Sequence, residues 1–385
     1  MFDIEKNIPK HWQIKKLGEI LKVSSGKGIK VNLLQGGDFP VYGGNGINGY
    51  HSEYFIEHPK LIIGRVGAKC GVTCITRPKS WVTDNALIVD PIISEFDIKF
   101  FQLKLEYENL NKLSVSTAQP VISGSKIYDY EILLPPLPEQ LAIVSKIEEL
   151  LSDLENGKHQ LLIAQQQLKV YRQSLLKAAF ENNGFEEYIL SDTTQKIQIG
   201  PFGTQLHKED YIDNGIPLIN PMHIQNGIIE ANYFYSIKEE KRNSLPNYIL
   251  EEGDVIMGRR GEMGRCGLVT KNESGWFCGT GSLYFRPQKE KLNSLFLYYY
   301  LTSQPIKKYL TDNAGGTTMA NLNLKIVNEI PIYLPSLKVQ QQIVDELESK
   351  LTVCDNIEET IKEALLKSES LRQSILKKAF SGQLI

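Results

Sequence analysis

The fold of this chain is decided by a segment that occurs twice: YRQSLLKAAF at residues 171–180 and LRQSILKKAF at residues 371–380. Seven of the ten positions are identical, at a spacing of 200 residues. The same spacing aligns LPPLPEQLAIV, beginning at Leu134, with LPSLKVQQQIV, beginning at Leu334. Earlier in each half the match is looser, and LIIGRVG, ending at Gly67, corresponds to VIMGRRG, ending at Gly261. An internal repeat of this length determines architecture, so we interpret the chain as a tandem duplication.

A long helix is predicted at the end of each half, because apolar residues recur there at alternating spacings of four and three. The seam of the first helix comprises Ile147, Leu150, Leu154, Leu161, Leu168 and Leu175. The seam of the second comprises Ile343, Leu347, Ile357, Ile361, Leu371 and Ile375. A single helix cannot bury such a stripe, so we expect the two helices to pack together as an antiparallel pair. An ordinary helical hairpin, or a coiled coil between two copies of the chain, is the alternative.

The predicted fold class is α+β, with two globular mixed α/β domains in tandem, each followed by a long helix. The helices are expected to form an antiparallel coiled coil with pseudo-two-fold symmetry. Short apolar runs between glycine turns predict strands at residues 59–66, 86–91, 254–258 and 282–287. The expected boundaries are 1–138 for the first domain, 139–180 for the central helix, 181–337 for the second domain and 338–385 for the C-terminal helix.

The composition is that of an ordinary soluble globular protein, with 42% hydrophobic and 23% charged residues among 385. No apolar run approaches the roughly 20 residues that span a bilayer, and the N-terminus lacks the apolar core of a secretory signal. We therefore expect a cytoplasmic protein with no membrane role. The five cysteines form no C-x-x-C pair, so free thiols are expected and a metal site is not.

The net charge gives no support for nucleic-acid binding. A formal charge of −2 and a pI near 6.4 differ from the strongly basic domains that typically bind DNA. Residues 1–135 contain 16 Lys and Arg against 14 Asp and Glu, and residues 181–334 contain 15 against 18. A DNA-binding surface would therefore have to arise from folding, which would gather basic loops on one face.

Motifs that would indicate catalysis are absent or incomplete. Gly44–Gly49 fits the pattern G-x-G-x-x-G, but no helix is expected after it, so we interpret it as a glycine-rich turn. Asn220-Pro-Met-His223 matches only part of the Asn-Pro-Pro-aromatic loop of adenine methyltransferases, and no S-adenosylmethionine loop accompanies it. The sequence also lacks a P-loop and a nuclease-like cluster of carboxylates. Any chemistry is therefore expected to lie in a partner protein.

Two Gly-Arg turns are candidate DNA-binding elements because they occur once in each half. Gly64-Arg-Val-Gly67 and Gly258-Arg-Arg-Gly261 each follow an apolar run. Glycine allows close approach of the backbone to a ligand, and arginine can bind guanine or a phosphate with two hydrogen bonds. The candidate side chains are Arg65, Lys69, Arg259, Arg260 and Arg265. The alternative is a structural turn whose arginine pairs with an acidic neighbour.

A polar stretch precedes each long helix, and the two stretches align at the spacing of 200. Such side chains suit adenine edges and phosphate oxygens, but they would equally suit helix caps and solvated turns. The candidates are Gln119, Ser123 and Lys126 in the first half and Thr317, Thr318, Asn321, Asn323 and Lys325 in the second. Because the two stretches differ in sequence, we expect the halves to read different DNA sequences.

The whole chain resembles the specificity subunit of type I restriction-modification enzymes. The resemblance rests on Ile8-Pro-Lys-His-Trp12, Leu17-Gly-Glu-Ile20, the turn Pro40–Gly46 and the Gly-Arg turns. It also rests on the repeated LP-x-L-x-x-Q-x-x-IV and RQS-x-L-K segments. The second half departs from the pattern at its entry, Phe185–Asp192, and has Met319 where the first has Gln119. Its contact residues are therefore less well defined.

The resemblance implies a non-catalytic subunit with two target-recognition domains that bind double-stranded DNA at a bipartite site. It implies that the helices set the spacing and bind two methyltransferase subunits, and that restriction and translocase subunits join the full complex. S-adenosylmethionine, ATP and Mg²⁺ would be used by those partners, and this chain would bind no cofactor.

Other classes of protein remain as alternatives. A recognition subunit of a related methyltransferase-nuclease system would have the same repeats. An autonomous DNA enzyme is disfavoured by the lack of catalytic motifs. A coiled-coil adaptor without a DNA role would explain the helices and the neutral charge, but it would not explain why a Gly-Arg turn and a polar stretch accompany each repeat.

Overall fold

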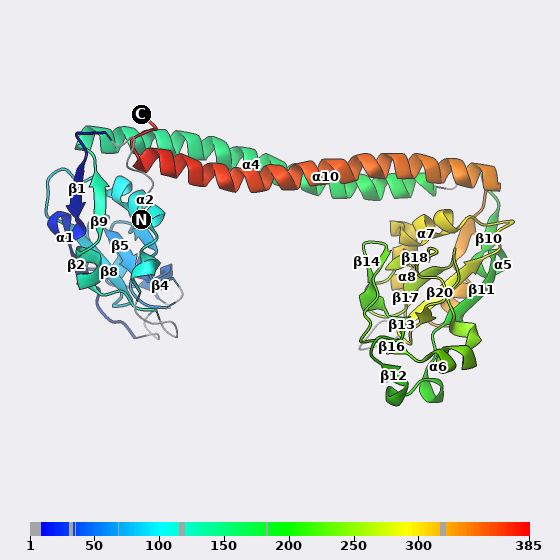
Figure 1. The fold of residues 1–385 in the computed structure, drawn as a ribbon. Coiled ribbons are helices and arrows are strands. Elements are labelled where there is room, and N and C mark those ends of the chain that lie inside the picture. The colour runs from blue at the N-terminus through cyan, green and yellow to red at the C-terminus, as the bar shows by residue number, and fades with distance from the viewer. Residues whose placement is uncertain are drawn as a thin grey trace. The chain divides into compact units, whose positions relative to one another are not determined.

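The computed structural model describes residues 9–30, 34, 36–67, 69–114, 120–181, 184–315 and 321–385. The chain divides into two compact units. Unit 1 comprises Met1–Leu161 with Glu363–Ile385, and unit 2 comprises Leu162–Lys362. Each unit therefore contains one globular domain and parts of both long helices (Figure 1).

The globular domain of unit 1 is built from short strands and three helices. Its strands are β1 (Gln13–Lys16), β2 (Leu21–Ser25), β3 (Phe39–Gly43), β4 (Gly46–His51), β5 (Leu61–Gly64), β6 (Thr73–Ile75), β7 (Trp81–Val82), β8 (Ala86–Pro91) and β9 (Glu131–Leu134). Its helices are α1 (Leu17–Ile20), α2 (Ile98–Glu108) and α3 (Gly124–Tyr128). The strands pair as β2-β8-β5-β6, β4-β3-β7 and β1-β9.

The globular domain of unit 2 has more strands and helices. Its strands are β10 (Glu187–Ile189), β11 (Thr194–Ile199), β12 (Tyr211–Ile212), β13 (Ile216–Ile219), β14 (Ile224–Gln225), β15 (Ile228–Ile229), β16 (Ser236–Ile237), β17 (Val255–Gly258), β18 (Cys266–Leu268), β19 (Phe277–Cys278), β20 (Ser282–Pro287) and β21 (Pro331–Tyr333). Its helices are α5 (Leu190–Thr193), α6 (Glu239–Ser244), α7 (Ser294–Thr302), α8 (Gln304–Asn313) and α9 (Leu324–Asn328). The strands pair as β11-β20-β17-β18, β12-β16-β13-β19, β10-β21 and β14-β15.

The two domains share one topology, as the duplication predicts. The antiparallel order β2-β8-β5-β6 recurs as β11-β20-β17-β18, and the pair β1-β9 recurs as β10-β21. A parallel pair also recurs, since β3 lies beside β7 and β13 lies beside β19. Alternation of apolar side chains on these strands forms the cores, with Ile63 and Leu87 buried in unit 1 and Met257 and Leu283 buried in unit 2. The predicted α+β class is confirmed.

The two long helices are α4 (Leu137–Ala179) and α10 (Leu337–Phe380). In unit 1, Ile147 near the start of α4 shares a core with Leu376 near the end of α10. In unit 2, Leu175 near the end of α4 lies beside Leu347 near the start of α10. The start of each helix therefore packs against the end of the other, which confirms the predicted antiparallel pair (Figure 1).

The predicted seam is wrong at two of its twelve positions. Of its residues, Ile147, Leu168, Leu347, Ile361 and Ile375 are buried, whereas Leu150, Leu154, Leu161, Leu175 and Ile343 are half-buried. Ile357 and Leu371 are 44% and 52% exposed, and the residues one position later, Glu358 and Arg372, are half-buried instead. The physical reason is that the aliphatic stem of a long charged side chain can cover apolar surface while its head group pairs near the surface. Arg372 pairs in this way with Glu106, at 3.3 Å.

A buried glutamine fixes the start of each long helix to the preceding domain. In unit 1, Gln140 accepts a hydrogen bond from the Asp97 amide (3.0 Å) and donates to the carbonyls of Glu95 and Pro135. In unit 2, Gln340 accepts from the Asn293 amide (2.8 Å) and donates to the carbonyls of Lys291 and Pro335.

Both glutamine clamps hold main-chain groups, so the same contact forms although the side chains around it differ.

Within the described residues, no helix is long and apolar enough to cross a membrane.

Candidate nucleic-acid interface

The Gly-Arg turn of unit 1 is held between two other loops by main-chain hydrogen bonds. It follows β5, and the Arg65 amide donates to the Asn85 carbonyl at 2.9 Å. On the other side, the Arg65 carbonyl accepts from the Ile122 amide at 3.0 Å, and Val66 forms an isolated β-bridge with Val121. The structure therefore brings the predicted turn and the predicted polar stretch together.

The Gly-Arg turn of unit 2 is held in the same way. The Arg259 amide donates to the Gly281 carbonyl at 3.0 Å, and the Arg259 carbonyl accepts from the Leu322 amide at 2.9 Å. Arg260 forms an isolated β-bridge with Asn321, which corresponds to the bridge between Val66 and Val121 in unit 1. Main-chain groups fix both turns, so the side chains on them can differ without loss of the support.

Glycine is favoured at two positions of each turn. The first glycine, Gly64 or Gly258, lies against a neighbouring loop, and an added Cβ would come within 2.4 Å of the Gly44 carbonyl oxygen or 3.1 Å of the Pro221 ring. The last glycine, Gly67 or Gly261, has a φ of +82° or +80°, which other residues rarely adopt. These requirements explain why the pattern G-R-x-G occurs in both halves.

Arg259 is buried without an ionic partner among the residues that the structure describes. Its exposed fraction is 9%, and its Nε donates to Asn321 Oδ1 at 3.0 Å. Burial, with a smaller effect of Arg260, lowers the pKa of the guanidinium. Among the described residues no carboxylate forms an ion pair with Arg259 or with Arg65, whose Nη1 donates to Ser25 Oγ at 3.3 Å. A buried cation is normally paired, so Arg259, together with the half-buried Arg65 at the equivalent position, is a group that an anionic ligand would satisfy.

Arg265 differs from these arginines, because it already has partners. Its Nη2 lies 2.7 Å from Glu262 Oε2, and its Nη1 donates to the Pro221 carbonyl at 3.3 Å. This arrangement matches the structural alternative given for such turns. The pairing also lowers the pKa of Glu262, first through the hydrogen bond from Arg265.

The other predicted contact residues are at the surface of the two domains. Lys69, Lys126, Arg260 and Lys325 are exposed and form no ion pair within the part of the chain that the structure describes. Ser123 is exposed, with its Oγ 2.9 Å from Ser125 Oγ, and Asn323 Oδ1 accepts from the Ile326 amide as the cap of α9. Gln119, Thr317 and Thr318, like Met319, lie outside the described residues.

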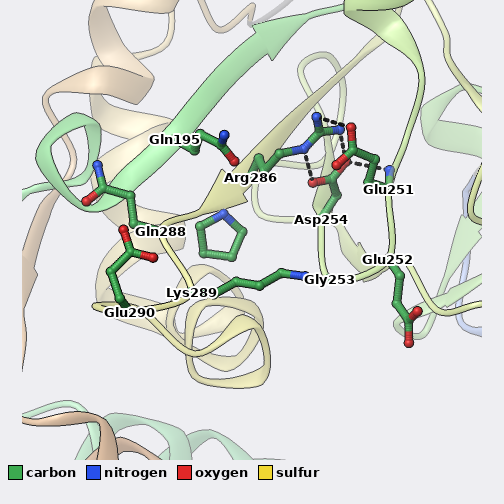
Figure 2. Close-up of a pocket in the computed structure, with 10 residues that line it drawn as sticks. Gln195, Glu251, Glu252, Gly253, Asp254, Arg286, Gln288, Lys289 and Glu290 are labelled. Carbon is green, nitrogen blue, oxygen red and sulfur yellow. Dashed lines mark hydrogen bonds and ion pairs between the residues drawn. The ribbon is translucent and has the colours of Figure 1, made fainter.

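A pocket lined by charged residues in unit 2 contains a structural ion pair (Figure 2). It measures about 520 Å³, and on its wall Arg286 pairs with Asp254 at 2.8 Å and also with Glu251. Burial raises the pKa of the Asp254 carboxyl, and Arg286 opposes that effect. Arg286 is therefore already held by two carboxylates of its own domain. The described residues also contain no group of three or more His, Cys, Asp or Glu that could hold a metal ion.

Two turns named from the sequence, at residues 43–46 and 220–223, lie directly against the Gly-Arg turns, but neither their equivalence nor this position was predicted. An alignment of FPVYGGNG (39–46) with IPLINPMH (216–223), at a spacing of 177, would have matched them. The spacing of 177 differs from the spacings of 194 and 200 found elsewhere because insertions lie between these segments. The correspondence is therefore visible only from the pairing of β3 with β7 and of β13 with β19.

Two domains of one topology, each with an arginine turn held by main-chain bonds, define a protein with two related binding surfaces. A family model described as "Type I restriction modification DNA specificity domain" matches residues 9–163 and 174–367. The chain therefore belongs to this family of type I restriction-modification specificity proteins.

Individual relatives agree with the family match. The chain is 25% identical over 378 residues to the type I restriction enzyme EcoBI specificity subunit of Escherichia coli, covering 92% of this chain and 78% of the relative. It is 23% identical over 411 residues to the EcoDI specificity subunit of the same species, covering 98% and 89%.

Solved structures share the fold. A structure described as the basis of "complex assembly and conformational transition of the type I R-M system" superposes with a TM-score of 0.78 at 18% identity, covering 98% of this chain and 99% of that one. The HsdS subunit from Thermoanaerobacter tengcongensis gives a TM-score of 0.65 at 18% identity, with full coverage of both chains.

Proposed function

We propose that this chain is the DNA-recognition subunit of a type I restriction-modification complex and reads a bipartite target, with one half-site for each domain. The observation that carries the proposal is the repeated turn: Arg65 and Arg259 stand at equivalent positions, are held by the same main-chain bonds and have no ionic partner among the described residues. Family membership supports the same function.

The chemistry of the turns suits DNA. A guanidinium can bind guanine O6 and N7 in the major groove or clamp a phosphate, and exposed lysines such as Lys69 and Lys325 can add phosphate contacts. The side chains of Ser123, Lys126, Asn321 and Asn323 lie on the loops bonded to the turns or directly after them. Phosphate contacts would position each domain, and base contacts would specify the sequence.

The partners follow from the same proposal. Two methyltransferase subunits would bind the paired helices α4 and α10, and restriction and translocase subunits would complete the assembly. This chain would be non-catalytic, and the partner subunits would use S-adenosylmethionine, ATP and Mg²⁺. It would act in the cytoplasm. A recognition subunit of a related methyltransferase-nuclease system is the second candidate, since it would use the same repeats.

The first test is a genome-wide map of N6-methyladenine in source cells with and without this gene. Loss of methylation at one bipartite motif is the expected result, and it would give both half-sites. Unchanged methylation, together with no sequence-specific DNA binding by the complex of this chain with its methyltransferase, would refute the proposal and leave the coiled-coil adaptor.

The second test measures the contribution of Arg259. Arg259→Ala, in the complex with the methyltransferase, should weaken target binding about tenfold to a hundredfold, since a bidentate contact contributes about 1–3 kcal/mol. Arg242→Ala is the matched control, because Arg242 lies in the same domain but already pairs with Glu239 at 3.4 Å. Equal affinities of the Arg259→Ala variant and the control would exclude Arg259 as a contact.

A further inference from the structure

The turns at residues 43–46 and 220–223 occupy the same place in the two domains. They follow the parallel strands β3 and β13, whose registers correspond: Val41 is opposite Trp81 on β7, and Leu218 is opposite Phe277 on β19. At the spacing of 177, Gly44 corresponds to Pro221, and Asn45 corresponds to Met222.

Each turn lies directly on the first glycine of a Gly-Arg turn. The Gly44 carbonyl oxygen lies 2.4 Å from the position of a Cβ built on Gly64, and the Pro221 Cβ lies 3.1 Å from one built on Gly258. Equivalent residues therefore make equivalent contacts in the two domains. The residue that follows, Asn45 or Met222, is placed beside the arginine turn in both.

Internal bonds make the turn in unit 2 a rigid support for Met222. Asn220 Oδ1 accepts from the Gly281 amide at 3.1 Å, and His223 Nδ1 accepts from the Asn220 amide at 3.1 Å. Residues 221–223 form one turn of 3-10 helix with Pro221 first. His223 is buried, and burial lowers the pKa of its imidazole, which favours the neutral ring that this bond requires.

The two side chains on these turns are open to solvent. Met222 is 53% exposed, although it is a large apolar residue next to a basic turn. Asn45 is exposed, and no described residue forms a hydrogen bond with its side-chain amide. Nothing in the packing of either domain therefore requires these residue types.

We infer that Asn45 and Met222 are matched specificity-determining residues, with Asn45 reading an adenine in one half-site and Met222 contacting a thymine C5-methyl group in the other. The inference rests on the proposed function. An asparagine amide can bond to adenine N6 and N7 together, and the thymine methyl is the apolar group that the major groove offers to an apolar side chain. Sequence reasoning placed no contact residue on either turn.

The experiment exchanges the two residue types. The complex of this chain with its methyltransferase subunits selects binding sites from duplexes in which the target is randomised, using wild type, Asn45→Met and Met222→Asn. Asn45→Met should lose the preference for adenine at one position of the first half-site, about tenfold to a hundredfold. Met222→Asn should change the preference at one position of the second half-site.

Each variant is the control for the other. Because each carries its change in one domain, unaltered preferences at the other half-site show that the complex is folded and assembled. Base preferences that are unchanged in both variants would overturn the inference and leave the proposed function intact. A wild-type complex that selects no bipartite sequence would overturn both.

Modified bases give a second readout that a merely structural role would not alter. Uracil in place of the thymine removes only the methyl group, and wild type should then bind about fourfold more weakly, as expected for one buried carbon. The Met222→Asn complex should bind the two duplexes equally. A uracil effect of the same size in both complexes would show that Met222 does not contact that methyl group.

Discussion

The strand pairs β5–β8 and β17–β20 occupy the same place in the two domains, yet their ion pairs have opposite polarity. In unit 1, Lys60 and Asp90 pair at 2.5 Å, and in unit 2, Asp254 and Arg286 pair at 2.8 Å. In unit 1 the basic residue, Lys60, directly precedes β5, whereas in unit 2 the basic residue, Arg286, lies on β20. What has been retained is the main-chain register, whereas the side chains need only be complementary.

The two pairs also differ in burial. The side chains of Lys60 and Asp90 are 36% and 50% exposed, while those of Asp254 and Arg286 are 1% and 14% exposed. The two ion pairs should therefore contribute differently to the free energy of unfolding, because water screens Lys60–Asp90 but not Asp254–Arg286. This contrast can be tested directly.

The largest effect is expected from charge reversal in the buried pair. Asp254→Lys should lower the free energy of unfolding by about 3–5 kcal/mol, because it leaves Arg286 buried beside a like charge. Lys60→Asp at the matching exposed pair should lower it by about 1 kcal/mol or less. Urea unfolding of the full chain measures both, and the double variant Asp254→Lys/Arg286→Asp should recover most of the loss. Equal losses from the two single variants would contradict the difference in burial.

A slightly smaller loss is expected when the buried glutamine clamps are removed. Gln140→Leu and Gln340→Leu should each lower the free energy of unfolding by about 2–4 kcal/mol, since buried main-chain groups lose their partners. Thermal unfolding measures the loss, and Gln342→Leu, which changes an exposed residue of α10, is the control. Markedly unequal losses from the two clamps would show that the domains are not fixed equivalently.

Acid should act on helix α2 of unit 1, which carries the buried ion pair Lys104–Glu108, whereas the equivalent helix α7 of unit 2 has no charged residue. Burial alone would raise the pKa of Glu108, but Lys104, at 2.7 Å, together with Tyr130 and Lys112, holds it below its ordinary value of 4.5. Unit 2 has Tyr300 at the place of Lys104, and its hydroxyl donates to the Pro331 carbonyl.

The sign of the pH effect follows from the lowered pKa. The stability that Glu108 contributes is present above pH 4.5 and is lost as the pH falls through the folded-state value. Glu108→Gln should therefore be less stable than wild type by about 1 kcal/mol at pH 7, and the difference should shrink toward pH 3. Thermal unfolding between pH 3 and pH 7 tests this, and a constant difference would show that Glu108 does not titrate as described.

The smallest effect is expected at the exposed position of the predicted seam. Ile357→Gln should change the free energy of unfolding by no more than about 0.5 kcal/mol, because the side chain is already in water. Ile361→Gln, one turn later and 5% exposed, is the matched variant and should cost about 2–4 kcal/mol. Similar losses at the two positions would restore the seam that the apolar pattern predicted.

The sequence was sufficient to predict the architecture, because the repeat and the heptad spacing are local patterns. The strands predicted at residues 86–91 and 282–287 coincide with β8 and β20. Two seam positions, Ile357 and Leu371, were wrong because residue type alone favours Ile357 over Glu358, whereas the helix pair buries the stem of the charged residue. Which side chain is covered at these positions depends on the partner helix, which the apolar spacing of a single helix does not contain.

The candidate site could be predicted only in part. The Gly-Arg turns were visible because their glycines have steric reasons to be retained, and the polar stretches were visible because they precede the repeated helices. The segments carrying Asn45 and Met222 were noticed singly, but their equivalence was not visible, because their likeness lies in strand register and not in residue identity. That Arg259 has no ionic partner within the described part of the chain is likewise a three-dimensional property, because it depends on loops distant in sequence.

The glutamine clamps have a consequence for how such proteins change. Gln140 and Gln340 bind peptide groups and not particular side chains, so a domain with a different binding surface can be joined to the same helix without redesign of the junction. New target preferences could therefore arise through exchange of one domain by recombination, while the other domain and the two long helices keep their sequences.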